Sequence, residues 1–175
     1  KYIAKLFIKN ILDYKHLRLT PKKQSHDDLY LVSFPKSGSM WLSFLMANIN
    51  ALQSSSLNKI THFNIENWIT DIHYTRNVSE SLKFRFPFYR IFKSHSKFNP
   101  YYRSVIYLIR DPRDVMISYH KFLLQLNSYS GSLSDLIRDK KYGIREWAEH
   151  LDSWWNLKST TSSIQFVRYE DMKDN

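Results

Sequence analysis

The sequence predicts an α/β fold with a mostly parallel central sheet and helices on both of its faces. Short apolar runs of strand length alternate along the chain with longer segments in which apolar residues recur at helical spacing. Such alternation is typical of strand–helix–strand units, which build parallel sheets. The chain has 175 residues, of which 43% are hydrophobic. This size and composition suit one globular domain, so we expect residues 1–175 to form a single unit.

Four apolar runs have the length and bounding residues of buried strands. They cover residues 29–34, 89–92, 104–109 and 163–167. Helical periodicity marks residues 40–53, 112–126 and 144–158, and Pro112 stands in a first turn, where a helix tolerates proline. Residues 54–87 and 127–143 fit neither period, so we expect loops or short helices there.

Residues 1–28 are expected to form a basic N-terminal helix and a connector. Between residues 2 and 18, apolar residues recur at near-helical spacing, with lysine and arginine between them. This pattern is typical of a helix that docks on its own domain, and also of one that makes a peripheral membrane or partner contact. No apolar run approaches the roughly 18 residues of a transmembrane segment.

The chain is strongly basic, because 26 lysines and arginines against 16 acidic residues give a formal charge of +10. This charge favours an anionic partner such as a nucleotide, nucleic acid, acidic glycan or membrane, without selecting among them. Cysteine is absent, which excludes disulfides and thiolate metal sites and favours a reducing compartment, so we expect a cytoplasmic protein. The histidines are not spaced as a ligand set, and we expect no metal.

The residues between the first predicted strand and helix form a candidate phosphate-binding turn. They are Pro35, Lys36, Ser37, Gly38, Ser39, Met40 and Trp41, and Gly38 is the only glycine among the first 130 residues. A tight turn here would aim backbone N–H groups and the positive helix end at a phosphate, with lysine and serine side chains beside it. The lysine precedes the glycine, unlike in the ordinary P-loop, which disfavours a standard nucleotide hydrolase. The alternative is a plain turn with a solvated lysine.

A second phosphate site is indicated by the segment from Arg110 to Asp114. Arg110 follows a predicted strand and Pro112 opens a helix, so a guanidinium group lies beside another positive helix end. Ser118 stands about two helical turns farther on and adds a hydroxyl if the helix runs past the ligand. The alternative is a structural network of ion pairs between arginine and aspartate side chains.

The third cluster, Lys93-Ser94-His95, follows the strand that is predicted to end near Phe92. Histidine is the side chain best suited to accept a proton near neutral pH. An isolated histidine is more often a surface or packing residue. Ligands of open α/β sheets bind at the carboxyl ends of the strands, however, and Lys36 and Arg110 also stand at strand ends. His95 is therefore a candidate general base.

Four segments occur in the order PKSGSMW, IFKSHSKF, YLIRDPRDVMISYHKF and FVRYEDMKDN. Together they resemble the cytosolic type of sulfotransferase that uses 3'-phosphoadenosine-5'-phosphosulfate (PAPS), and the resemblance spans about residues 29–174. It implies that residues 35–41 wrap the 5'-phosphosulfate, with Lys36 reaching the oxygen that bridges sulfate and phosphate and Trp41 lying by the adenine.

The resemblance also implies roles for the other candidates. Arg110 and Ser118 would hold the 3'-phosphate, and Tyr169 would contact the adenine. His95 would be the general base, with Lys93 assisting it. The activity implied is transfer of a sulfuryl group from PAPS to a hydroxyl or amine of an acceptor, with the desulfated nucleotide PAP as the product.

The chain departs from the family pattern in two places. The family's loop commonly carries two threonines where this chain has Ser39 and Met40. The family also continues beyond the RYEDM segment to a loop that closes over the nucleotide, a closing segment that we expect this chain to lack. The alternatives are a P-loop-type kinase or hydrolase and a non-catalytic module that binds anions. We expect no nucleic-acid partner, and the sequence leaves the acceptor and the oligomeric state open.

Overall fold

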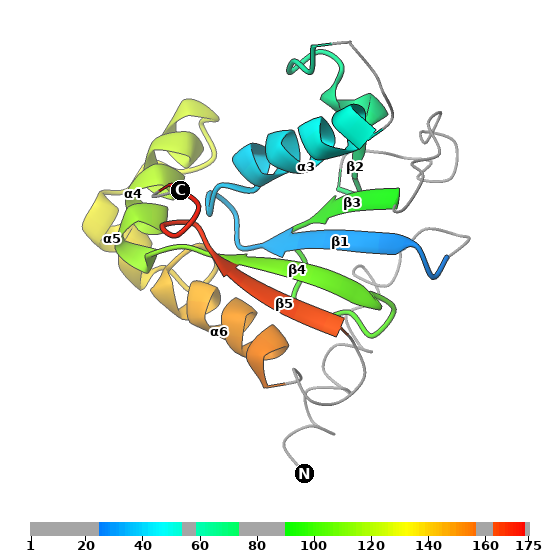
Figure 1. Cartoon of the computed structure of the whole chain (residues 1–175). Helices are drawn as coiled ribbons and strands as arrows, with labels where there is room; N and C mark the ends of the chain where they lie inside the picture. The colour runs from blue at the N-terminus through cyan, green and yellow to red at the C-terminus, as the bar shows by residue number, and fades with distance from the viewer. Residues whose placement is uncertain (1–24, 54–58, 74–89, 157–162, 174–175) are drawn as a thin grey trace.

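The computed structural model describes residues 25–53, 59–73, 90–156 and 163–173 (Figure 1). Five strands in these ranges form one parallel sheet in the order β2-β3-β1-β4-β5. The strands are β1 (Asp28–Ser33), β2 (Ile69–Asp71), β3 (Arg90–Ser94), β4 (Ser104–Ile109) and β5 (Ser163–Arg168). The predicted α/β class and parallel sheet are confirmed. The helix predicted over residues 2–18 lies outside the described residues.

Helices cover both faces of the sheet, as predicted. The described helices are α3 (Ser39–Gln53), α4 (Pro112–Gln125), α5 (Leu133–Arg138) and α6 (Ile144–Trp155), with a 3-10 turn η1 (Ile65–Asn67). Figure 1 shows α3 over one face and α6 under the other, while α4 and α5 stand beyond the carboxyl ends of the strands. The carboxyl ends of β1, β3, β4 and β5 therefore open towards the start of α3 and towards α4.

Two predictions about local structure were wrong: residues 54–87 contain a strand, and β3 extends farther than predicted. The short strand β2 lies within the segment that we expected to hold only loops or short helices. Its three residues are too few to show a period, and pairing with β3, with Ile69 opposite Ile91, is what makes them a strand. The strand predicted to end at residue 92 continues to Ser94, so Lys93 lies within β3 rather than after it. The prediction for residues 127–143 is confirmed by α5.

The alternation of side chains along the strands divides the core into two layers. Leu31, Ile91 and Leu108 pack with Leu42 and Ala47 of α3 on one face of the sheet. On the other face, Tyr30, Phe92 and Tyr107 pack with Trp154 of α6. Because both faces of the central strands are buried, a slip of one residue in register would move every side chain to the wrong layer. The register therefore fixes which residues meet at the carboxyl ends.

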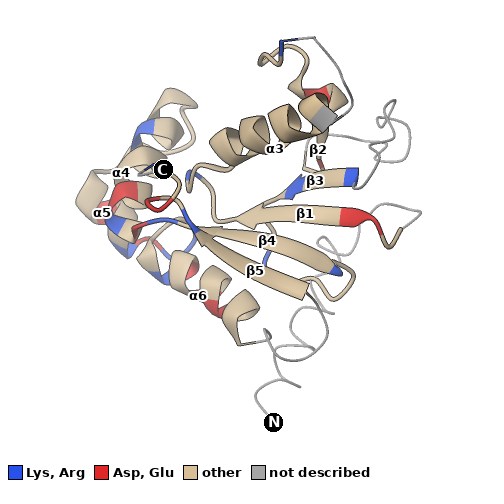
Figure 2. Ribbon diagram, in the orientation of Figure 1, with Lys and Arg blue, Asp and Glu red and all other residues tan. Residues whose placement is uncertain are grey.

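A buried ion pair joins β1 and β3 at the end of the sheet away from the candidate site. The Nε atom of Arg90 donates to the Oδ1 atom of Asp28 over 2.6 Å, and Asp28 is only 2% exposed. The two residues are partners in the strand register, and Figure 2 shows the basic start of β3 beside the acidic start of β1. The pair helps to hold the alignment of the two strands that carry the candidate base and the phosphate-binding turn.

The two-layer core generates a prediction for two adjacent tryptophans. Trp154 is fully buried against the sheet, whereas Trp155 is 50% exposed. We expect Trp154→Ala to lower the free energy of unfolding by about 3–5 kcal/mol, because it leaves a large cavity. Trp155→Ala is the matched control and should cost much less, since this side chain is half exposed, with its ring near Phe166. Urea denaturation followed by circular dichroism measures both, and equal losses would contradict this account of the core.

Candidate active site

The turn after β1 is strained at Lys36. The N–H of Ser37 donates to the carbonyl of Phe34 over 3.2 Å, which closes a four-residue turn with Pro35 in its second position. Lys36 occupies the third position with φ 68°, where such turns usually carry glycine or asparagine. A side chain held in this conformation costs on the order of 1–3 kcal/mol, and such strain is concentrated at functional sites. A plain surface turn gains nothing from a lysine at this position.

Gly38 allows the turn to pack directly against Tyr169. Its φ is 100°, and its carbonyl accepts the first hydrogen bond of α3, from the N–H of Leu42 over 3.2 Å. A Cβ atom at Gly38 would overlap the Tyr169 ring, with Cε2 only 2.5 Å away. Beside it, the buried Oγ atom of Ser37 has no hydrogen-bond partner in the described part of the chain. Buried hydroxyls are nearly always bonded, so this group fits a cradle for a polar ligand.

Arg110, directly after β4, brings a second cation to the same place. Its guanidinium lies over the Tyr169 ring at 4.4 Å, and its Nη1 atom donates to the carbonyl of Lys36 over 3.4 Å. Burial lowers the pKa of the Lys36 ammonium, and the positive charges of Lys93 and Arg110 lower it further. The Nε atom of Arg110 is buried without a partner among the described residues. Three cations close together, one of them with an unused donor, fit a polyanionic ligand.

The predicted network of ion pairs is present only in part. Arg113 pairs with Asp111 over 2.5 Å at the surface, where Asp111 also caps α4 by accepting from the backbone of Arg113. Arg110 makes a 3.3 Å contact with Asp114 and keeps its Nε atom unused. Ion pairing with an aspartate therefore explains the role of Arg113, whereas it leaves part of the Arg110 guanidinium available to a ligand. Ser118 is half-buried on α4, and no hydrogen bond in the described ranges links it to the other predicted site residues.

Aromatic rings border the turn on two sides. Trp41, 37% exposed on the first turn of α3, meets the edge of the Tyr169 ring with centroids 5.4 Å apart. The Nζ atom of Lys36 lies over the ring of Phe122 on α4 at 4.3 Å. The structure thus brings together the predicted residues of the turn, Arg110 and Tyr169.

His95 is held as a neutral acceptor. Its Nδ1 atom lies 2.8 Å from the carbonyl oxygen of Ser33, which can only accept, so Nδ1 carries the proton and Nε2 keeps its lone pair. Burial lowers the pKa of His95 to about 4; the bond to Ser33 opposes this shift, whereas the charge of Lys93 adds to it. The imidazole is therefore neutral near pH 7, as a general base must be.

Two neighbours of this histidine, Asp71 at the end of β2 and His73 in the turn after it, were missed by the sequence analysis. The backbone N–H of His95 donates to the Nε2 atom of His73 over 2.7 Å, and their rings stack with centroids 5.8 Å apart. The Nζ atom of Lys93 donates to Asp71 over 2.8 Å. Asp71 and His73 alternate with buried Ile72, a pattern of strand type. β2 itself has only three residues, Ile69–Asp71, which are too few to show a period in the sequence.

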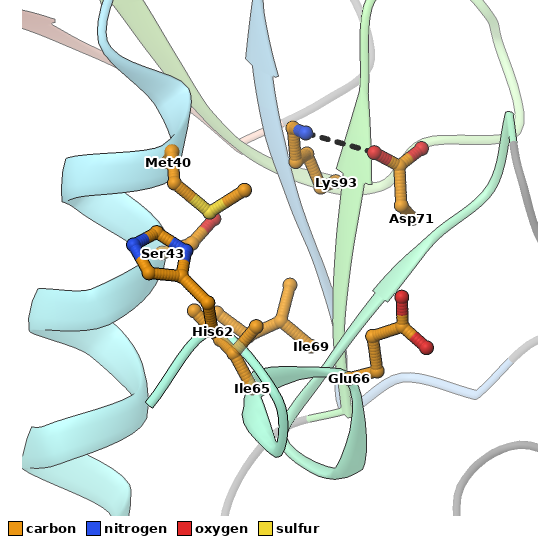
Figure 3. Close-up of a pocket in the computed structure, with 8 residues that line it drawn as sticks. All are labelled: Met40, Ser43, His62, Ile65, Glu66, Ile69, Asp71 and Lys93. Carbon is orange, nitrogen blue, oxygen red and sulfur yellow. Dashed lines mark hydrogen bonds and ion pairs between the residues drawn. The ribbon is translucent and has the colours of Figure 1, made fainter. Parts of the chain in front are cut away.

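A cavity of about 230 Å³ adjoins Lys93 (Figure 3). It lies between the start of α3, η1 and the strands β2 and β3. Its lining consists of Met40, Ser43, His62, Ile65, Glu66, Ile69, Asp71 and Lys93. Figure 3 shows the pair of Lys93 and Asp71 at one end of the cavity, with Glu66 farther along the same side. Met40, predicted as part of the phosphate turn, thus also faces this cavity.

The described ranges contain no helix with the length and apolarity needed to cross a membrane. Within the same ranges, no three side chains of histidine, cysteine, aspartate or glutamate are grouped to hold a metal ion.

The contact of Gly38 with Tyr169 generates a prediction. Gly38→Ala should lower the free energy of unfolding by about 1–3 kcal/mol, because the residue must keep a positive φ and its methyl group meets the ring. In a double-mutant cycle with Tyr169→Ala, measured by urea denaturation, part of this loss should disappear because the collision is removed. Additive losses would show that the two residues are not in contact.

Comparison with known proteins identifies the family. Residues 26–175 match the model described as the sulfotransferase domain. The chain is 30% identical to Sulfotransferase 1E1 of Rattus norvegicus, over 98% of this chain and 60% of the relative. It is 28% identical to Sulfotransferase 4A1 of Homo sapiens, over 83% of this chain and 54% of the relative.

A solved structure has a similar fold. The crystal structure of retinol dehydratase in complex with androsterone and the inactive cofactor PAP superposes with a TM-score of 0.59 at 15% identity, over 87% of this chain and 57% of that chain. The present chain thus spans little more than half the length of the proteins that it matches. Because the family model covers residues 26–175, the chain belongs to the sulfotransferase domain family.

Proposed function

We propose that this chain is a PAPS-dependent sulfotransferase, which moves a sulfuryl group from PAPS to a hydroxyl or amine of an acceptor. The observation that carries the proposal is a neutral His95, with its Nε2 lone pair available, directly after the strand that holds Lys93. Lys93 in turn lies close enough to Lys36 to lower its pKa. A non-catalytic module that binds anions has no use for a base kept neutral in this way. Among proteins of similar fold, retinol dehydratase binds PAP.

The nucleotide would lie along the carboxyl ends of β1, β4 and β5. The unused Ser37 hydroxyl and Lys36 suit the 5'-phosphosulfate, and the unused Nε–H of Arg110 suits the 3'-phosphate. Tyr169 and Trp41 offer aromatic surface for the adenine. We assign Ser118 to the 3'-phosphate from the family resemblance, since it stands on α4, which follows Arg110.

The reaction is an in-line displacement at sulfur. His95 takes the proton of the acceptor at Nε2 while the acceptor oxygen or nitrogen forms its bond to sulfur. The bond between sulfur and the bridging oxygen breaks, and its electron pair leaves on the phosphate of PAP. Lys36 stabilises the charge that develops on that oxygen, and Lys93, held by Asp71, adds a positive charge beside the base.

Loss of either phosphate-binding cation should weaken nucleotide binding. Lys36→Ala and Arg110→Ala each remove a charge-assisted contact worth about 1.5–3 kcal/mol, so the Kd of PAP should rise roughly 10- to 150-fold. Arg145→Ala is the control, because Arg145 is a largely exposed residue of α6. Isothermal titration calorimetry measures all three variants. Unchanged PAP affinity in both site variants would refute the assigned nucleotide site.

Replacement of the base should affect the rate and spare nucleotide binding. His95→Asn should reduce kcat by roughly 10²–10⁴-fold, because no imidazole is then present to take the proton of the acceptor substrate. The Kd of PAP should change little, since the histidine contacts the acceptor and no phosphate. Single-turnover assays with labelled PAPS, together with calorimetry, measure the two quantities. Wild-type turnover in a folded variant would place the base elsewhere.

The pH dependence should reflect the lowered pKa of His95. The neutral imidazole is the active form, so kcat/KM should be flat near pH 7 and fall only as the pH approaches about 4. An ordinary histidine would give this fall near pH 6.5. A pKa below the unfolded value also means that stability contributed by neutral His95 is lost as pH falls from about 6.5. Circular dichroism at each pH separates unfolding from titration, and a fall centred at pH 6 to 7 in folded protein would contradict the assigned environment.

A further inference from the structure

The cavity beside Lys93 contains polar groups that the fold leaves uncommitted. Ser43 of α3 is 2% exposed, lines the cavity, and its Oγ atom has no hydrogen-bond partner among the described residues. The carboxylate of Glu66 lies at the cavity and forms no ion pair with any described residue. A buried hydroxyl without a partner is rare in folded proteins. The Ser43 hydroxyl is therefore a candidate contact for a polar group of a ligand in this space.

The charge of the cavity wall is opposite to that of the chain. Glu66 and Asp71 place two carboxylates on the wall, against one ammonium group, that of Lys93. Lys93 is already paired with Asp71, and the exposed carboxylate of Glu66 has no ion-pair partner within the described ranges. The rest of the wall consists of apolar Met40, Ile65 and Ile69 and the polar side chains of Ser43 and His62. A cavity of this kind favours a cationic ligand in a chain whose formal charge is +10.

We infer that this cavity binds the acceptor, and that the acceptor is a small molecule with an apolar skeleton and a cationic group such as an ammonium. The inference rests on the proposed sulfotransferase function. Lys93 and Asp71 line the cavity, Lys93 lies two residues before His95, and the charges of both side chains act on the imidazole, so the cavity lies near the base. An acceptor in the cavity thus presents its hydroxyl towards His95 and its cationic group towards Glu66. The volume of about 230 Å³ lies below the roughly 300 Å³ of small drug-sized pockets, which selects a single-ring acceptor.

The cationic group takes no part in the reaction. The acceptor hydroxyl gives its proton to Nε2 of His95, and its oxygen forms the new bond to the sulfur of PAPS. The bond from that sulfur to the bridging oxygen breaks, and the electron pair leaves with PAP. Charge on the far side of the acceptor therefore changes its binding and leaves the chemistry of the step unaltered.

Three phenols that share a ring and hydroxyl test the inference: tyramine (cationic), 4-ethylphenol (neutral) and 3-(4-hydroxyphenyl)propionate (anionic). Binding to the ¹⁵N-labelled chain, with and without PAP, is followed by NMR. We expect shifts at the amides of Ser43 and Ile69. The Kd of tyramine should be about two- to fivefold below that of 4-ethylphenol, as for an exposed ion pair, and the anion should bind weakest. Added salt should reduce these differences.

Matched variants locate the preference. Glu66→Gln should abolish the advantage of tyramine, whereas Asp152→Asn, an exposed carboxylate on α6 under the other face, should preserve it. Ser43→Ala should weaken tyramine binding about two- to tenfold, as for one lost hydrogen bond. Its Tm should not fall, because the hydroxyl has no partner to lose.

The outcomes separate this inference from the proposed function. No shifts at the cavity, or a tyramine preference that survives Glu66→Gln, would overturn the inference even if PAPS supports turnover of other acceptors. Binding with the expected charge preference, but without sulfuryl transfer to tyramine when PAPS is added, would support the cavity as a cation-binding site and count against the sulfotransferase assignment. Transfer with the same order of kcat/KM for the three phenols would support both.

Discussion

The candidate nucleotide site depends on one contact, that of the Tyr169 ring with Gly38. Tyr169 follows β5 and is tied to the neighbouring strand, because its N–H donates to the carbonyl of Ile109 over 2.7 Å. Its ring meets Gly38 after β1, lies under the guanidinium of Arg110 after β4, and touches the edge of Trp41. A single aromatic ring therefore fixes the positions of groups that three different strands supply. Any side chain at position 38 would separate them.

The candidate base depends on strand register in the same way. Leu31, Lys93 and Asp71 are aligned across β1, β3 and β2. Two residues farther along the chain from these three come Ser33, which ends β1, and His95 and His73, which lie just beyond the ends of β3 and β2. The hydrogen bonds of His95 to the other two join this second row. The buried core that fixes the register therefore also fixes the tautomer of His95, since the proton faces the carbonyl of Ser33.

The sequence predicted those parts of the structure in which apolar residues follow a regular spacing, or in which a glycine or proline marks the boundary of an element. The central strands contain short apolar runs, and Gly38 and Pro112 mark the places where strands give way to helices. The short strand β2 was missed because its stability comes from pairing with β3. Asp71 and His73 were missed with it. No spacing in the sequence connects these residues to Lys93 and His95, about twenty positions away, since only sheet order makes them neighbours.

The ion pair of Lys93 with Asp71 lies where two regions of opposite charge meet. On one side are Lys36 and Arg110, and the charge of Lys93 adds to theirs by lowering the pKa of Lys36. On the other side is the cavity with the carboxylate of Glu66, which pairs with no residue in the described part of the chain. The charge of Lys93 lowers the pKa of His95, whereas that of Asp71 raises it. Because the two charges oppose each other at the imidazole, burial is the main cause of its low pKa. The base therefore stays neutral beside a cationic site and an acidic cavity, and its protonation state depends on how completely that end of the sheet is shielded from water.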